Sequence, residues 1–197
     1  YPPGSTFKVV TAAAALDTGV YKPTSIVNGD SPKEFSGKPM ANSGNQSFGD
    51  ISLTTALTKS VNTVWGQVGE KLGDETMLEY MKRFGFYAKP PVDLPENQVA
   101  ASGLREGGEL LPDDTAIDVA RVAIGQERLT VTPLQMATVA ATVANGGKRV
   151  RPHIADEFRD RYGRVKETIE TDEVEQVIDR RSAAQLIENY GTQPLRA

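Results

Sequence analysis

Residues 1–17 read Tyr-Pro-Pro-Gly-Ser-Thr-Phe-Lys-Val-Val-Thr-Ala-Ala-Ala-Ala-Leu-Asp, and we expect this stretch to decide the fold. Pro3 and Gly4 break any regular structure before Ser5. The alanine-rich residues that follow predict a helix over residues 5–17, ended by Thr18-Gly19. Because residues 12–15 are all alanine, other helices can approach this one closely on every side.

Ser5 and Lys8 are three residues apart, so on a helix their side chains lie on one face. A serine hydroxyl is a weak nucleophile unless a base takes its proton, and a lysine amine is a base only when its pKa is lowered. The first turn of a helix also leaves N–H groups unpaired, so the Ser5 N–H can donate to an oxyanion. The alternative is that Ser5 is a helix cap and Lys8 is exposed.

Ser60-Val61-Asn62 falls where we expect one helix to end and the next to begin. Residues two apart share a face in an extended or turn conformation, but not in a helix. A turn here would aim both polar side chains into one cavity, where Ser60 can relay a proton to a leaving group and Asn62 can hydrogen-bond a substrate amide. The alternative is that both residues are only helix caps.

The whole chain predicts roughly seven helices and very few strands. Residues 21–52 and 86–112 are expected to be irregular, the first with one hairpin around residues 35–39. Trp65 and Phe84 fit a helix core, and the only histidine, His153, fits a structural position. Further helices are predicted over 52–59, from 61 or 62 to 72, and over 74–84, 114–124, 132–144 and 180–190, with strand-like pieces over 150–158 and 165–169.

The composition excludes several kinds of protein. The chain has 197 residues, 24% of them charged, and a net charge of -4 without a long basic run, so we expect no nucleic-acid partner. There is no cysteine, which excludes a disulfide scaffold and a cysteine nucleophile and disfavours zinc. No metal or cofactor is expected. The longest apolar run, residues 9–16, is too short to span a bilayer, and no signal peptide is visible.

Five short motifs follow one another in the chain: residues 1–8, Ser-Val-Asn-Thr at 60–63, Ile-Gly-Gln at 124–126, Leu-Thr-Val-Thr-Pro-Leu-Gln-Met-Ala at 129–137, and Ala-Asn-Gly-Gly at 144–147. In their order and spacing they resemble the transpeptidase domain of class B penicillin-binding proteins. The resemblance covers residues 1 to about 155. It implies an α/β (α+β) fold of the penicillin-binding and β-lactamase type, here mostly helical because this chain keeps the helical subdomain and little of the sheet.

The resemblance also implies a serine D,D-transpeptidase. Ser5 would attack the D-Ala–D-Ala carbonyl of a peptidoglycan stem peptide, release D-alanine and pass the acyl group to an amine of a neighbouring stem. β-Lactam antibiotics would acylate the same serine. Lys8 would be the base, Ser60 and Asn62 would have the supporting roles given above, and residues 124–126 and the helix from Pro133 would be structural elements near the site.

The parent protein would then be exported to the extracytoplasmic face of the bacterial cell membrane, with its anchor outside this chain. Candidate partners are a glycosyltransferase and the proteins of cell division or elongation. Two alternatives remain open. One is a related D,D-carboxypeptidase or β-lactamase, and the other is a non-catalytic β-lactam sensor or binding module.

The third motif of the family, Lys-Thr-Gly or Lys-Ser-Gly, is absent from the sequence. We expect residues 1–197 to be a partial transpeptidase domain that lacks the strands before Ser5 and the later strand carrying this motif. That strand would supply the second oxyanion donor, and losing one donor costs about 10² to 10³ in rate. We therefore expect this chain by itself to be acylated slowly or not at all.

Overall fold

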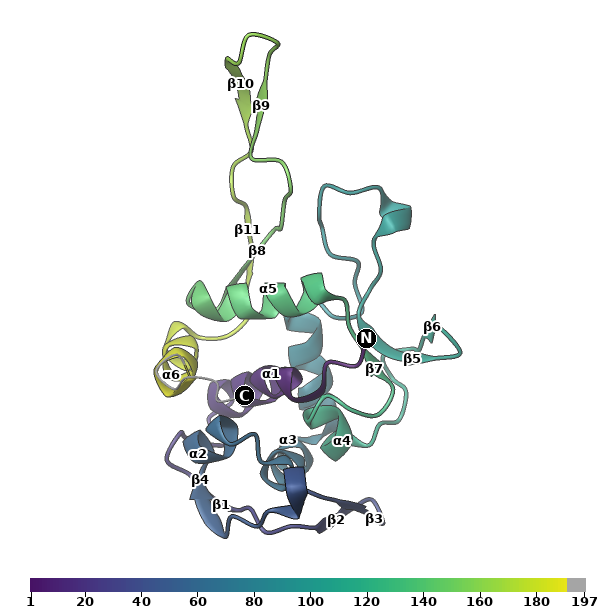
Figure 1. Ribbon diagram of the computed structural model, residues 1–197, viewed down its shortest axis with the longest axis vertical. Coiled ribbons are helices and arrows are strands. Elements are labelled where there is room, and N and C mark those ends of the chain that lie inside the picture. The colour runs from purple at the N-terminus through teal and green to yellow at the C-terminus, as the bar shows by residue number, and fades with distance from the viewer. Residues whose placement is uncertain (191–197) are drawn as a thin grey trace.

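Helix α1 (Lys8–Asp17) lies at the centre of a helical body (Figure 1). In the computed structural model, which describes residues 1–190, it packs against α3 (Asn62–Arg83), α4 (Val119–Ala123) and α6 (Arg180–Tyr190). Its four alanines, residues 12–15, are completely buried, as their small size predicts. One 3₁₀ turn, η1 (Gly4–Phe7), precedes α1 and carries Ser5, so the predicted helix begins with a tighter turn.

The remaining helices surround α1 in the order that the sequence predicts. Helix α3 is interrupted at Gly73, whose backbone (φ 81°, ψ 165°) is not helical, where the sequence predicts one helix to end and another to start. Trp65 and Phe84 are completely buried, as predicted. The other helical elements are α2 (Leu53–Thr58), α5 (Pro133–Ala144), η2 (Ser43–Asn45) and η3 (Glu96–Gln98).

The sequence underestimates the number of strands, because they are only two to four residues long and show no clear alternation. They form two-stranded antiparallel pairs and one three-stranded sheet, β6-β5-β7. The hairpin predicted around residues 35–39 is present as β2 and β3, and the pair β1–β4 closes the irregular segment that contains it. The strands are β1 (Ile26–Asn28), β2 (Lys33–Phe35), β3 (Lys38–Met40), β4 (Asp50–Ser52), β5 (Gly103–Glu106), β6 (Glu109–Leu110), β7 (Leu129–Thr130), β8 (Lys148–Val150), β9 (Glu157–Arg159), β10 (Val165–Thr168) and β11 (Glu173–Gln176).

The helix predicted over residues 114–124 is too long. Helix α4 begins only at Val119, because the Asp118 side chain accepts a hydrogen bond from the Arg121 N–H and caps the helix there. Asp113 is drawn instead toward α3, where it forms an ion pair with Lys82. Residues 114–118 are therefore a loop against α3.

The strand predicted over residues 150–158 is divided between β8 and β9. Pro152 lacks an N–H group, and the Asp93 carboxylate accepts hydrogen bonds from the N–H groups of Ile154 and Ala155 at 2.7 and 3.0 Å. These backbone groups are therefore bound to a loop and not to a neighbouring strand. Beyond this break, β9 and β10 form an arm that projects from the helical body (Figure 1).

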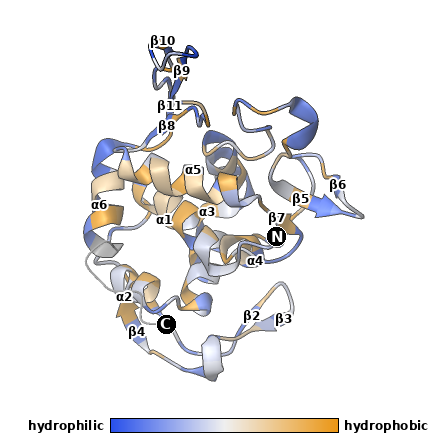
Figure 2. Cartoon of the chain, turned by 45° about the horizontal axis from the view of Figure 1, so that its top comes forward, coloured by the Kyte–Doolittle hydropathy of each residue, from blue (hydrophilic) through white to orange (hydrophobic). Residues whose placement is uncertain are grey.

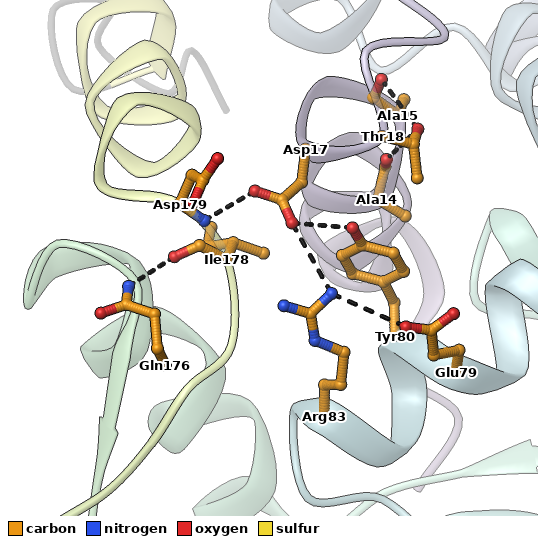
Figure 3. Close-up of polar contacts among 10 residues, drawn as sticks. All are labelled: Ala14, Ala15, Asp17, Thr18, Glu79, Tyr80, Arg83, Gln176, Ile178 and Asp179. Carbon is orange, nitrogen blue, oxygen red and sulfur yellow. Dashed lines mark hydrogen bonds and ion pairs between the residues drawn. The ribbon is translucent and has the colours of Figure 1, made fainter.

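A buried carboxylate joins three of the central helices (Figure 3). Asp17, at the end of α1, accepts hydrogen bonds from the Tyr80 hydroxyl at 2.7 Å and from the Asp179 N–H, just before α6, at 2.6 Å. Arg83 of α3 lies 3.7 Å from the same carboxylate. This cluster fixes the end of α1 that is farther from Ser5.

Figure 2 shows hydrophobic residues concentrated on the central helices, with a mostly hydrophilic arm at β9 and β10. Among the helices of residues 1–190, none has both the length and the hydropathy needed to cross a membrane.

Candidate active site

Ser5 and Lys8 lie one turn apart at the junction of η1 and α1. The Nζ atom of Lys8 is 3.0 Å from the Oγ atom of Ser5. Ser5 is exposed, whereas only 1% of Lys8 is accessible, because the side chain extends from an enclosed helix into the body of the protein. Lys8 is therefore not the exposed lysine of the alternative interpretation. No side-chain capping bond is formed at the start of η1 or α1 either.

Ser60 and Asn62 lie in a tight turn between α2 and α3. Ser60 has a left-handed backbone (φ 55°), and the Val61 N–H donates to the Ala56 carbonyl at 2.8 Å, which ends α2. Helix α3 then begins at Asn62. The turn that the sequence predicts is thus present, and neither serine nor asparagine serves as a side-chain cap of α3.

The two motifs meet at the amine of Lys8, across more than fifty residues of sequence. Besides Ser5, the Nζ atom lies 2.9 Å from the Ser60 carbonyl oxygen, 3.0 Å from the Ser60 Oγ atom and 2.6 Å from the Asn62 Oδ1 atom. The other three predicted site residues are therefore all within hydrogen-bond distance of the Lys8 nitrogen.

A buried amine in this position is easier to deprotonate than an ordinary lysine. Burial removes water from around the ammonium group and lowers the pKa of Lys8 from 10.5 to about 7. A substantial fraction of Lys8 is therefore neutral at pH 7, and a neutral amine can accept a proton from a hydroxyl.

The irregular segment before α2 holds Asn62 in place. The Asn62 Nδ2 atom donates to the Ala41 carbonyl at 2.9 Å, which turns the Oδ1 atom toward Lys8. The neighbouring Asn42 is buried, and its Oδ1 atom accepts from the Thr63 N–H at 3.0 Å. Its Nδ2 atom donates to the carbonyls of Gly29 and Gln46 at 3.0 and 2.9 Å. The Asn42 amide thus links this segment to the first turn of α3.

Sequence reasoning did not identify Asn42 or the Ala41 carbonyl. The only signal was the length of the segment over residues 21–52, since long irregular segments in compact domains are often functional.

The only histidine of the sequence lies outside this site. His153 lies between β8 and β9, and its Nδ1 atom is 2.6 Å from the Ala155 carbonyl oxygen, consistent with a structural position. Across the part of the chain that the structure describes, no group of three or more His, Cys, Asp or Glu side chains could hold a metal ion.

Comparisons with known proteins identify the family of this chain. The family model for the penicillin binding protein transpeptidase domain matches residues 1–190. The peptidoglycan D,D-transpeptidase PbpA of Mycobacterium tuberculosis (strain ATCC 25618 / H37Rv) is 34% identical over 166 residues, which cover 81% of this chain and 32% of the relative. PbpA of Mycolicibacterium smegmatis is 36% identical over 163 residues, which cover 81% of this chain and 32% of that protein.

The fold is also similar to solved structures. Penicillin-binding protein A from M. tuberculosis, in its imipenem acyl-enzyme complex, superimposes with a TM-score of 0.86 at 29% identity, over 100% of this chain and 45% of that one. Measured against the two PbpA sequences, the chain spans about a third of the length of the curated relatives it matches. The fold class and the family predicted from the motifs are both confirmed. This chain belongs to the family of penicillin-binding protein transpeptidase domains.

Proposed function

We propose that the chain carries the nucleophilic site of a serine D,D-transpeptidase, with a peptidoglycan stem peptide as its substrate and β-lactams as acylating inhibitors. The observation that carries the proposal is the buried Lys8 amine, with a pKa of about 7, at 3.0 Å from the Ser5 hydroxyl. The names of the relatives support the substrate class, because PbpA is named a peptidoglycan D,D-transpeptidase.

The hydrogen bonds around Lys8 favour its role as a base. The ammonium form has three N–H donors for four nearby oxygens, whereas the neutral amine has two donors and one lone pair. The Ser60 carbonyl and the Asn62 Oδ1 atom can only accept, so they take the two donors of the neutral amine. The lone pair is then left for a hydroxyl, and the Ser5 hydroxyl can donate its proton to it.

Acylation follows from this geometry. As the Ser5 Oγ atom bonds to the carbonyl carbon of D-Ala–D-Ala, its proton moves to Lys8 and the carbonyl oxygen becomes an oxyanion. The C–N bond to the terminal D-alanine then breaks, and the leaving nitrogen needs a proton. Ser60, whose Oγ atom is 3.0 Å from the Lys8 Nζ atom, can relay that proton from the lysine to the leaving group.

The second half of the reaction reverses these transfers. An amine of a neighbouring stem attacks the acyl-enzyme carbonyl and loses its proton toward Lys8, and the Ser5 oxygen leaves and regains its proton. Asn62 holds the lysine throughout through its Oδ1 atom and can also hydrogen-bond a substrate amide.

We also propose that this chain is a partial domain and that the strands before Ser5 and the Lys-Thr-Gly strand are supplied by other parts of the gene product. Because peptidoglycan lies outside the cytoplasm, the site would act at the extracytoplasmic face of the membrane, held there by an anchor outside this chain. Partners would be a glycosyltransferase and proteins of division or elongation.

The proposal is tested by intact-mass spectrometry of the full-length gene product after incubation with benzylpenicillin. One penicilloyl group should be added to the wild type, and none to S5A or to K8M. S36A, which changes an exposed serine in the turn between β2 and β3, should react like the wild type. Undiminished labelling of S5A would exclude Ser5 as the nucleophile.

The lifetime of the adduct separates the alternatives within the superfamily. A transpeptidase should hold the penicilloyl group for hours, whereas a β-lactamase should release it within seconds. A sensor would be acylated stably but would not cross-link stem peptides, so a cross-linking assay with the acylation-competent protein identifies it.

A further inference from the structure

Gly125 lies directly against the backbone of Gly4, the residue before Ser5. The Gly4 N–H donates to the Gly125 carbonyl at 3.0 Å. A Cβ atom on Gly125 would lie 2.0 Å from the Gly4 carbonyl oxygen, 2.7 Å from its carbon and 2.9 Å from its nitrogen. Since atoms without a bond between them cannot approach so closely, no other residue fits at position 125 unless the backbone at Gly4 moves.

The atoms that Gly125 touches belong to the peptide group that leads into Ser5. The carbonyl carbon and oxygen of Gly4 form a rigid plane with the Ser5 nitrogen, so contact with one edge of the plane fixes the direction of the Ser5 N–H. In the proposed reaction that N–H stabilises the oxyanion and the adjacent Oγ atom attacks. Gly125 therefore contacts the peptide group that carries the Ser5 N–H and acts on both reacting groups through the backbone.

The segment that contains Gly125 is fastened to the same structural elements as the site. The Thr11 hydroxyl, completely buried in α1, donates to the Ala123 carbonyl at 2.7 Å. A Cβ atom on Gly69 of α3 would lie 2.5 Å from the Ala123 Cβ atom, so α3 and α4 pack so closely that only glycine fits at position 69. Because α3 begins at Asn62, one continuous set of contacts runs from Asn62 along α3, across Ala123 to Gly125 and on to Ser5.

We propose that Gly125 is a positioning residue for acyl transfer, which sets the plane of the Gly4–Ser5 peptide and thereby aims the Ser5 N–H and Oγ at the reacting carbonyl. This rests on the proposed function of Ser5. A positioning role predicts that a change at Gly125 slows the acylation step and leaves the binding of the β-lactam unchanged. A purely structural role does not predict this difference.

The test compares G125A with G163A in the full-length gene product. Both glycines have left-handed backbones (φ 74° and 80°), but a Cβ atom on Gly163, in the arm, would meet no heavy atom within 4 Å. The two variants thus share backbone strain and differ in the collision with Gly4. Stopped-flow measurement with a chromogenic cephalosporin gives the non-covalent affinity and the acylation rate constant separately.

The acylation rate constant of G125A should fall about 10²-fold, because a displacement of about 1 Å at a reacting group has that effect, while its non-covalent affinity stays close to that of G163A. An equal acylation rate constant in the two folded variants would overturn the proposal. If G125A does not fold, the T11V variant tests the proposal instead. It keeps the volume at position 11 but removes the bond to Ala123, and it should acylate about tenfold more slowly. Wild-type acylation by T11V would then overturn the proposal.

A second measurement needs no reaction. In ¹H–¹⁵N spectra of the full-length gene product, the amide resonance of Ser5 reports the plane of the Gly4–Ser5 peptide group, and that of Gly4 reports its hydrogen bond to the Gly125 carbonyl. They should move in G125A, or in T11V if G125A does not fold, and stay in place in G163A. If the wild-type gene product takes up no β-lactam, the proposed function fails. In that case the amide resonances alone test whether Gly125 sets the plane of the Gly4–Ser5 peptide. Unchanged resonances of Gly4 and Ser5 in the variant would refute this.

Discussion

The Oδ1 atom of Asn62 lies 2.6 Å from the Nζ atom of Lys8, the shortest of the four contacts around that amine. The other side of the Asn62 amide is bound to the Ala41 carbonyl, so Asn62 presents an oxygen, and not an N–H group, to the lysine. The acceptor that faces Lys8 is thus uncharged, and burial lowers the pKa of the lysine.

Acylation by the full-length gene product should depend on pH through Lys8. Because the pKa of Lys8 is lowered to about 7, the reactive neutral amine is in the majority above pH 7 and in the minority below it. The second-order rate constant for penicillin should be level above pH 8 and fall about tenfold for each pH unit well below 7. A midpoint near 10, where an exposed lysine titrates, would contradict the buried position of the base.

N62D should move that midpoint upward. A carboxylate at 2.6 Å would favour the ammonium form, and an opposite charge at this distance raises a lysine pKa by about 1 to 3 units. Acylation at pH 7 should therefore fall in N62D and recover in part at pH 9. N97D places the same charge on the exposed η3 turn and should keep the wild-type profile. A loss in N62D that is equal at every pH would point to the amide's contact with substrate.

The stability of the chain should also depend on the pH through Lys8. The unfolded lysine keeps its pKa of 10.5, and the folded one has a pKa of about 7, so between these values the unfolded state binds the extra proton. Raising the pH from 7.5 to 9.5 should then increase the free energy of unfolding by about 1.4 kcal/mol per pH unit from this group. K8M should lose that increment in urea denaturation. Equal slopes for wild type and K8M would show that the folded lysine is charged.

Asn42 should be more sensitive to substitution than its place in an irregular segment suggests. In N42D, a carboxylate would face the carbonyls of Gly29 and Gln46, to which the amide now donates. The free energy of unfolding should fall by about 3 kcal/mol, because both carbonyls lose their donor, the one at Gly29 is buried, and a charge is buried beside it. Acylation should fall with it, since Asn42 also binds the first turn of α3. N97D is again the matched control, and equal stability of the two variants would contradict this account.

The parts of the site that the sequence predicted are those set by local geometry. Ser5 and Lys8 share a face because of helical spacing, and Ser60 and Asn62 share a turn because one helix ends and another begins between them. Even the interruption at Gly73 could be read from a glycine followed by a capping residue.

The parts that the sequence missed depend on contacts between distant segments. The bond from Asn62 to Ala41 spans 21 residues, and the contact between Gly4 and Gly125 spans far more, so no local pattern contains either. Helix α4 begins late for a local reason, because Asp118 caps it. The ion pair between Lys82 and Asp113, by contrast, joins segments that are distant in the sequence. Helical periodicity alone therefore predicted too long a helix there.

Asp17 offers a test of how firmly the far end of α1 is held. Its side chain is 8% exposed and accepts from the Tyr80 hydroxyl and the Asp179 N–H, with Arg83 beside it (Figure 3). Burial, and then the hydrogen bond to Asp17, raise the pKa of Tyr80, so the phenol remains a donor at neutral pH. Glu79 lies 3.8 Å from the same arginine but is 64% exposed.

D17A should reduce the free energy of unfolding by about 3 kcal/mol, because it leaves buried donors and a cation without their acceptor. Y80F removes only one donor and should cost about 1 kcal/mol. E79A should stay within about 0.5 kcal/mol of the wild type, since an exposed ion pair contributes little. Urea denaturation at pH 7 measures all three. If D17A and E79A were equally stable, the carboxylate would not be what joins α1 to α3 and α6, and the packing of the buried alanines of α1 would have to hold these helices together instead.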